Sequence, residues 1–288
     1  MIVERIFEAV KNQGHVCVGL DTELSYLPKG FADSFKTRGD AIFQFNKEII
    51  DKTSDIAACY KVQIAYYEAL GLEGLKAYSD TLRYMKQKNA ISICDIKRGD
   101  IQKTAEMYAK GHFEGDFEGD FITLNAYMGI NDSLEPFLDY IANKEKGIFV
   151  LIRTSNLGAK DFQYIKDQNG EYLYTIIAEK LQKLAQQYIG KCGFSSIGGV
   201  VGCTNNEEGI QLRNKIKNLF LLIPGYGAQG GGAEDVVPYM INGNGGVVNS
   251  SRGIITAYKN EGTNPNDFAE ASRRAVLKMR DDIWRAIQ

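Results

Sequence analysis

Histidine is scarce in this 288-residue chain, and the cysteines lack the spacing of a metal site. Only His15 and His112 are present, so no HExxH or other histidine-based pattern occurs. This scarcity argues against a catalytic zinc ion. The cysteines are odd in number and form no CxxC pair: Cys17, Cys59, Cys94, Cys192 and Cys203. Because four of them lie inside apolar segments, we expect small buried core residues.

Long apolar runs and an excess of either charge are also missing. No run approaches the ~20 apolar residues that a membrane-spanning helix needs. The first residues, MIVERIFEAVKNQ, predict an amphipathic helix and lack the apolar core of a signal peptide. The formal net charge of -2 gives no reason to expect nucleic acid or a membrane as a partner. We therefore predict a cytoplasmic protein.

Short apolar segments recur along the chain, with helical patterns between them. The predicted strands are 15–21, 56–64, 90–96, 120–125, 147–153, 197–203, 218–223 and 246–249. The predicted helices are 38–53, 68–87, 103–114, 133–142, 172–188, 207–217, 234–242 and 267–286. This alternation, with no linker between halves, favours an α/β fold: one closed (β/α)8 TIM barrel over residues 1–288. A doubly wound open sheet is the main alternative, but its dinucleotide fingerprint is missing after the first strand.

Charged residues gather at the ends of the first three predicted strands, where barrels carry their active sites. Residues two apart on a strand point to the same side, so Asp95 and Lys97 should stand side by side. Lys61 would enter the same barrel mouth from the second strand, and Asp21 ends the first. Asp100 falls beyond the third strand, at the start of a helix. The alternative is structural: Asp100 caps the helix, while Asp95 and Lys97 form an ion pair.

Glycines and an arginine follow the last two predicted strands. The seventh strand runs into PGYGAQGGG (224–232) and the eighth into SSRG (250–253). Glycines allow backbone N–H groups to approach an anion, and a helix starting near Ala233 would add its positive end. Arg252 could pair bidentately with phosphate oxygens, which predicts a phosphate site. Alternatively, these glycines serve only tight turns.

Two further segments have open interpretations. The connection 156–171 is long and polar, which is typical of either a lid or a simple insertion. The adjacent residues Tyr66 and Tyr67 are predicted to pack in the core rather than to stack on a ligand.

Several of these segments together resemble one enzyme family. The string DIKRGDIQKT (95–104) resembles the DxKxxDIxxT signature of orotidine 5'-phosphate decarboxylases. The matches run in order from Gly19 to Ile254, and several of them resemble the longer bacterial branch of that family. The other matching strings are KVQIA (61–65), EALG (68–71), RTSN (153–156), PGYGAQGG (224–231) and NSSRG (249–253).

The resemblance implies decarboxylation of orotidine 5'-phosphate to UMP, the last step of de novo pyrimidine nucleotide synthesis, with no metal and no organic cofactor. Lys97 would deliver a proton to C6 of the pyrimidine after CO₂ leaves. Asp95 would lie against the departing carboxylate, and Lys61 and Asp100 would complete a charged array.

The resemblance also implies how the nucleotide is held. Asp21, Lys61 and Thr104 would contact the ribose hydroxyls, and Ser155 would recognise the pyrimidine edge. Gln229 and Arg252 would hold the 5'-phosphate. In this family the residues equivalent to Asp100, Ile101 and Thr104 reach into the neighbouring subunit's site, which implies a homodimer with shared active sites.

Two other functions compete with this hypothesis. A related barrel, a keto-gulonate phosphate decarboxylase, has a similar Asp-x-Lys-x-x-Asp unit but needs Mg²⁺. The segments around Gln229 and 154–156 argue against it. A non-catalytic sensor of nucleotide phosphates would have little need for the full set of charges.

Overall fold

Eight parallel strands form a closed barrel in which each strand pairs with its neighbours in chain order. The computed structural model describes residues 1–203, 206–227, 230–262 and 264–288. The strands are β1 (Val16–Gly19), β2 (Cys59–Gln63), β3 (Ser92–Arg98), β4 (Phe121–Leu124), β5 (Gly147–Arg153), β6 (Ser195–Val201), β7 (Leu219–Pro224) and β8 (Gly246–Ser250). β8 pairs with β1 and closes the barrel, so the predicted (β/α)8 fold is confirmed and the open sheet is excluded.

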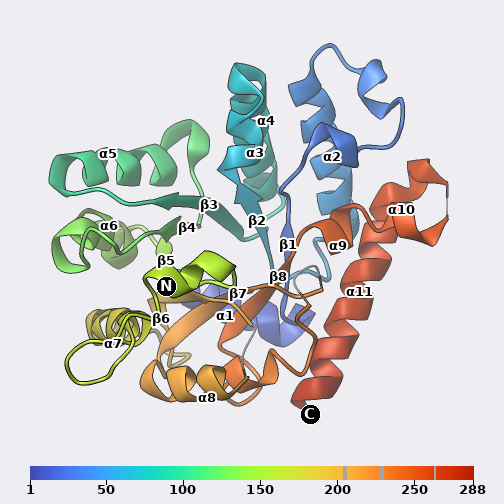
Figure 1. Cartoon of the computed structure of the whole chain (residues 1–288). Helices are drawn as coiled ribbons and strands as arrows, with labels where there is room; N and C mark the ends of the chain where they lie inside the picture. The colour runs from blue at the N-terminus through green and yellow to red at the C-terminus, as the bar shows by residue number, and fades with distance from the viewer. Residues whose placement is uncertain (204–205, 228–229, 263) are drawn as a thin grey trace.

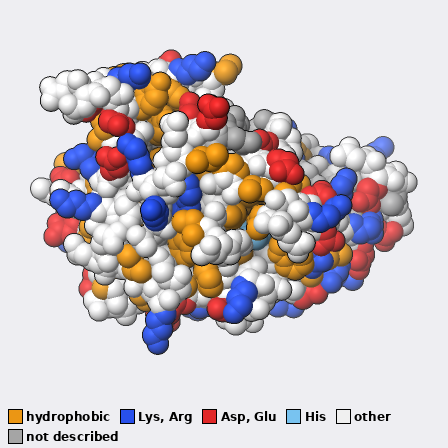
Figure 2. Space-filling view, turned by 90° about the horizontal axis from the view of Figure 1, so that it is seen from below, with side chains coloured by type: hydrophobic (Ala, Val, Ile, Leu, Met, Phe, Trp, Pro, Cys, Tyr) orange, Lys and Arg blue, Asp and Glu red, His pale blue; other side chains and the backbone are white. Residues whose placement is uncertain are grey.

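Helices surround the strands (Figure 1). In chain order they are α1 (Ile2–Gln13), α2 (Arg38–Thr53), α3 (Ile64–Glu68), α4 (Gly71–Gln87), α5 (Gln102–Phe113), α6 (Asn131–Asn143), α7 (Leu173–Ala185), α8 (Asn206–Lys215), α9 (Arg252–Ile255), α10 (Tyr258–Glu261) and α11 (Phe268–Ile287). Among these helices, none is long and apolar enough to cross a membrane. Charged side chains of both signs are interspersed on the face shown in Figure 2.

The alternation of side chains along each strand divides the apolar residues into two cores. Val16 and Val18 of β1 face the helices, whereas Cys17 between them faces the barrel interior. The amphipathic helix α1 buries Ile2 and Ile6 against this interior core and so closes the N-terminal end of the barrel. The C-terminal end remains available for polar groups. As expected, Cys17, Cys59, Cys94 and Cys203 are buried.

Two predicted helices differ from those observed. The predicted helix 68–87 is interrupted, because α3 ends at Glu68 and Gly71 begins α4 with a φ of +64°. The predicted helix 234–242, which was to start near Ala233, is wrong: only the short 3-10 turn Val237–Tyr239 forms there. Pro238 explains the difference, since it has no N–H to donate within a helix.

The connection after β5 is folded. It contains the 3-10 turn Leu157–Asp161 and an antiparallel bridge between Lys166 and Tyr172. Gln163 ties it to the end of β5 by accepting a hydrogen bond from Thr154 N at 2.8 Å. Its role as a lid stays a prediction.

Candidate active site

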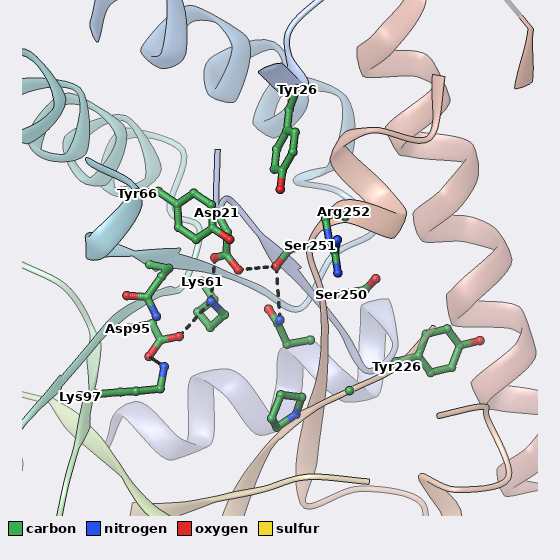
Figure 3. Close-up of a pocket in the computed structure, with 14 residues that line it drawn as sticks. Asp21, Tyr26, Lys61, Tyr66, Asp95, Lys97, Tyr226, Ser250, Ser251 and Arg252 are labelled. Atoms are coloured by element: carbon green, nitrogen blue, oxygen red, sulfur yellow. Dashed lines mark hydrogen bonds and ion pairs between the residues drawn. The ribbon is translucent and has the colours of Figure 1, made fainter. Parts of the chain in front are cut away.

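A polar cavity of about 510 Å³ opens at the C-terminal end of the barrel. It is lined from the ends of β1, β2, β3, β7 and β8, where polar side chains were predicted to converge. Its charged residues are Asp21, Lys61, Asp95, Lys97 and Arg252. Figure 3 shows these side chains pointing into one space, with the aspartates and lysines in a row and Arg252 on the side of β8.

The row is a continuous network of hydrogen-bonded ion pairs. Lys61 Nζ lies 2.8 Å from Asp21 Oδ1 and 3.0 Å from Asp95 Oδ2. Lys97 Nζ lies 2.6 Å from Asp95 Oδ1. Each oxygen of Asp95 therefore contacts a different lysine. At its other end the row continues to Ser251, whose Oγ donates to Asp21 Oδ2 at 2.8 Å.

The register of the strands creates this network. Gly19 of β1 is paired with Lys61 of β2, and Gln63 of β2 with Asp95 of β3. Lys61 therefore begins two residues below the level of Asp95, and its long side chain reaches up to Asp21 and Asp95 at the rim. Gly19 also makes room for Ser251, because a Cβ at position 19 would lie 1.9 Å from Ser251 Oγ. Only glycine permits this close approach.

Burial and charge act in opposite directions on the two central groups. Burial alone raises the pKa of Asp95, but the positive charges of Lys61 and Lys97 outweigh burial and hold the pKa well below its usual range. Burial alone lowers the pKa of Lys61, yet the charges of Asp21 and Asp95 raise it above its usual value. Both groups are therefore ionised at neutral pH.

Lys97 has an unusual backbone. Its φ of +43° lies in the left-handed region, and the register between β3 and β4 shifts between Cys94 and Arg98. Its N–H donates to Thr123 Oγ1 of β4 at 2.9 Å. Thr123 Oγ1 in turn donates to Asp95 Oδ1 at 2.8 Å. A β-bulge of this kind re-aims a side chain, here the lysine at the cavity.

Arg252 lies on the opposite side of the cavity, at the start of α9. Among the described residues, no acidic side chain pairs with it. Gly225, with a φ of +112°, lines the same side together with Tyr226. An exposed guanidinium beside a glycine turn suits an anionic group. Gln229, predicted to act with Arg252, lies outside the described residues.

Of the predicted site residues that the structure describes, four do not line this cavity: Asp100, Ile101, Thr104 and Ser155. Asp100 accepts a hydrogen bond from Ile101 N at 2.9 Å and contributes no cap to α5, so its alternative interpretation as a helix cap is wrong. Ile101 and Thr104 are exposed. Ser155 is half-buried beside Gly202, which follows β6.

Several lining residues were missed from the sequence. Tyr66 packs against the hydrophobic core, as predicted, and also lines the cavity, whereas its neighbour Tyr67 is fully buried and donates to Leu20 O. Tyr26 and Tyr226 also line the cavity. Adjacent tyrosines give no periodic signal that separates a core residue from a cavity residue. In the described part of the chain, no group of three or more acidic, histidine or cysteine side chains is arranged to hold a metal ion.

Comparison with known proteins places the chain in one family. Residues 14–263 match the model of the Orotidine 5'-phosphate decarboxylase / HUMPS family. The chain is 60% identical over 288 residues to the orotidine 5'-phosphate decarboxylase of Clostridium kluyveri, covering 100% of this chain and 99% of the relative. It is 58% identical over 287 residues to that of Clostridium acetobutylicum, covering 100% of both.

Solved structures give the same result for the fold. A putative orotidine 5'-phosphate decarboxylase from Streptomyces avermitilis superimposes with a TM-score of 0.83 at 26% identity, covering 99% of this chain and 95% of the other. An OMP decarboxylase from Leishmania donovani gives 0.78 at 28% identity, covering 99% and 98%.

Proposed function

The chain belongs to the Orotidine 5'-phosphate decarboxylase / HUMPS family, and we propose that it converts orotidine 5'-phosphate to UMP without a metal or organic cofactor. This reaction is the last step of de novo pyrimidine nucleotide synthesis. The named relatives at 58% and 60% identity favour it over the other activities of the family.

One observation supports the chemistry above all: Lys97 is a cation whose partner is a buried carboxylate. Loss of CO₂ from C6 leaves an electron pair on a ring carbon that no carbonyl can delocalise. Without a cofactor as electron sink, a preorganised positive charge is the means of stabilising this pair. Lys97 is the more exposed of the two lysines in the row, with 46% of its side chain exposed against 6% for Lys61, and it lines the cavity.

The proposed step is a decarboxylation followed by proton transfer. The bond between C6 and the carboxylate breaks, CO₂ leaves, and the electron pair stays on C6. Lys97 Nζ then donates a proton to C6 and is later reprotonated from solvent. Asp95 lies beside Lys97 and would face the departing carboxylate. Lys61 and Lys97 hold Asp95 ionised, and Lys61 and Asp21 would contact the ribose hydroxyls.

Substrate binding is assigned to the other side of the cavity and to the rim. Arg252, with Gln229, would hold the 5'-phosphate, and Ser155 would recognise the pyrimidine edge. The phosphate is remote from the reacting carbon, so its binding energy can order the charged row around the substrate.

We further propose a homodimer in which each subunit completes its partner's site with Asp100, Ile101 and Thr104. These residues lie at the start of α5, which is next to α6 in Figure 1. Large exposed apolar side chains lie on or beside these two helices: Ile101, Met107, Tyr127 and Met128. A surface of this kind suits a second copy of the chain.

A cytoplasmic location and the absence of nucleic-acid or membrane partners stay predictions. They are supported by the small net charge and the lack of long apolar runs in the sequence.

The test is a spectrophotometric assay with orotidine 5'-phosphate, with and without excess chelator. We expect the absorbance change of decarboxylation at the same rate in both. Activity that disappears with chelator would favour the Mg²⁺-dependent sugar-phosphate decarboxylase. Absence of turnover in both conditions, with retained nucleotide binding, would favour the sensor.

A further inference from the structure

We propose that Thr123 is a positioning residue for this reaction: its hydroxyl holds both the backbone and the carboxylate partner of Lys97. The inference rests on the proposed function for its catalytic consequence. Thr123 lies on β4, a strand to which neither the sequence motifs nor the cavity lining assigns a role.

The hydrogen bonds around Thr123 form a closed ring. Lys97 N donates to Thr123 Oγ1 at 2.9 Å, Thr123 Oγ1 donates to Asp95 Oδ1 at 2.8 Å, and Lys97 Nζ returns to Asp95 Oδ1 at 2.6 Å. A backbone N–H can only donate, so the hydroxyl must accept from it and its own hydrogen goes to the carboxylate. Both directions are therefore fixed by the chemistry of the partners.

This ring controls the backbone at the position where the strand is irregular. A lysine at a φ of +43° is unfavourable, and it persists only where its surroundings hold it. The N–H of Lys97 finds its acceptor in a side chain of β4 at the shift in register. The Thr123 hydroxyl therefore takes the place of a backbone carbonyl as the acceptor for Lys97 N, and this side-chain hydrogen bond stabilises the bulge.

The ring also controls the carboxylate. Asp95 uses Oδ2 for Lys61 and Oδ1 for Lys97, so a rotation of the carboxylate would disturb both ion pairs. Thr123 opposes that rotation because the residue is buried, so its hydroxyl cannot follow the carboxylate. The side chain of Lys97 is 46% exposed, so its ammonium depends on Thr123 and Asp95 for its position.

The expected consequence is confined to the chemical step. Thr123 does not line the cavity, and the phosphate side around Arg252 is formed by other strands. Removing the hydroxyl should therefore lower kcat and leave KM nearly unchanged. Misplacement of a reacting group by about 1 Å can cost about 100-fold in rate.

The experiment compares Thr123→Val, which keeps the shape and loses the hydroxyl, with Thr123→Ser, which keeps the hydroxyl. We expect kcat to fall by about 10- to 100-fold in Thr123→Val, with KM within about threefold of wild type, and to be nearly restored in Thr123→Ser. Equal kcat in wild type and Thr123→Val, or equal losses in both variants, would overturn the proposal. Loss of a cooperative unfolding transition in Thr123→Val would also overturn it, because the hydroxyl would then serve barrel stability.

A second measurement does not depend on activity. Amide hydrogen exchange of the Lys97 N–H should be slow in wild type and Thr123→Ser and fast in Thr123→Val. Unchanged exchange in Thr123→Val would refute the positioning role. If the wild type does not act on orotidine 5'-phosphate, the proposed function fails, while this exchange measurement still decides whether Thr123 holds Lys97.

Discussion

Lys97 Nζ lies 2.6 Å from Asp95 Oδ1, although the lysine side chain is 46% exposed and the aspartate side chain only 7%. The buried member of the pair is fixed by three groups: Lys61, Lys97 and Thr123. Because Lys61 and Thr123 also hold the carboxylate, the exposed lysine takes its position from a group that is already fixed by buried partners. This relationship explains how a flexible lysine can be held at a defined place in an open cavity.

Replacing Asp95 by Asn should destabilise the fold in a pH-dependent way. Its folded-state pKa lies below the unfolded value of about 4, so the stabilisation is present above about pH 4 and is lost as the pH falls through the lower, folded-state pKa. At pH 7 we expect a loss of about 3 kcal/mol in the free energy of unfolding. Urea unfolding of wild type and Asp95→Asn at pH 7, 5 and 3 measures this difference.

The control is Asp116→Asn, which removes an exposed partner of Arg83 and should change stability by less than about 1 kcal/mol. A difference between wild type and Asp95→Asn that is constant down to pH 3 would refute the assigned role of the ion pairs.

Arg153→Leu should destabilise the C-terminal rim. Arg153 is 2% exposed and lies 2.7 Å from Glu208, and it also donates to Gly202 O and Tyr239 OH. Its loss breaks a buried ion pair and removes the two hydrogen bonds, which we expect to cost about 3–5 kcal/mol. Urea unfolding measures the effect. Arg285→Leu, at an exposed ion pair, should cost less than about 1 kcal/mol; similar losses in both variants would contradict this account.

The sequence predicts those parts of the site that follow from two regularities: the alternation of side chains along a strand and the order of the strands in the barrel. Asp95 and Lys97 are two residues apart on β3, and Lys61 lies on the neighbouring strand, so their meeting follows from the barrel alone. The hydrogen bond between Ser251 and Asp21 joins the segments that follow the last and the first strand, and it depends on the register of β8 against β1, which the sequence does not show.

Thr123 could not be identified in advance for a different reason. Threonine is common in strands because it is β-branched, so its presence in β4 carries no functional signal. Its role depends on a bulge that no periodic pattern predicts. At 234–242 the opposite happens: the sequence pattern is present, but the structure it predicts is not. The apolar spacing is helical, while Pro238 prevents the helix.

Arg252→Ala should mainly weaken the binding of phosphorylated substrate. Hydrogen bonds between charged groups contribute about 1.5–3 kcal/mol, so we expect KM for orotidine 5'-phosphate to rise about 10- to 100-fold. Phosphate-free orotidine is the matched comparison, since it lacks the group that Arg252 would hold. An equal loss with both substrates would show that Arg252 does not act on the phosphate.

Mixing two inactive variants tests the shared site. Lys97→Ala and Asp100→Ala are each expected to be inactive as homodimers. After subunit exchange, a heterodimer combines Lys97 of one subunit with Asp100 of the other in one intact site, so activity should return. If Asp100 acts within its own subunit, both sites stay defective and mixing restores nothing.

The most direct test of the account is the turnover of orotidine 5'-phosphate by Lys97→Ala, followed by ultraviolet absorbance. Lys86→Ala is the matched control, because Lys86 is exposed, pairs with Glu118 and lies outside the cavity. We expect wild type and Lys86→Ala to decarboxylate the substrate at similar rates and Lys97→Ala to lose nearly all activity. Retention of more than a few per cent of wild-type activity in Lys97→Ala would contradict its role as proton donor.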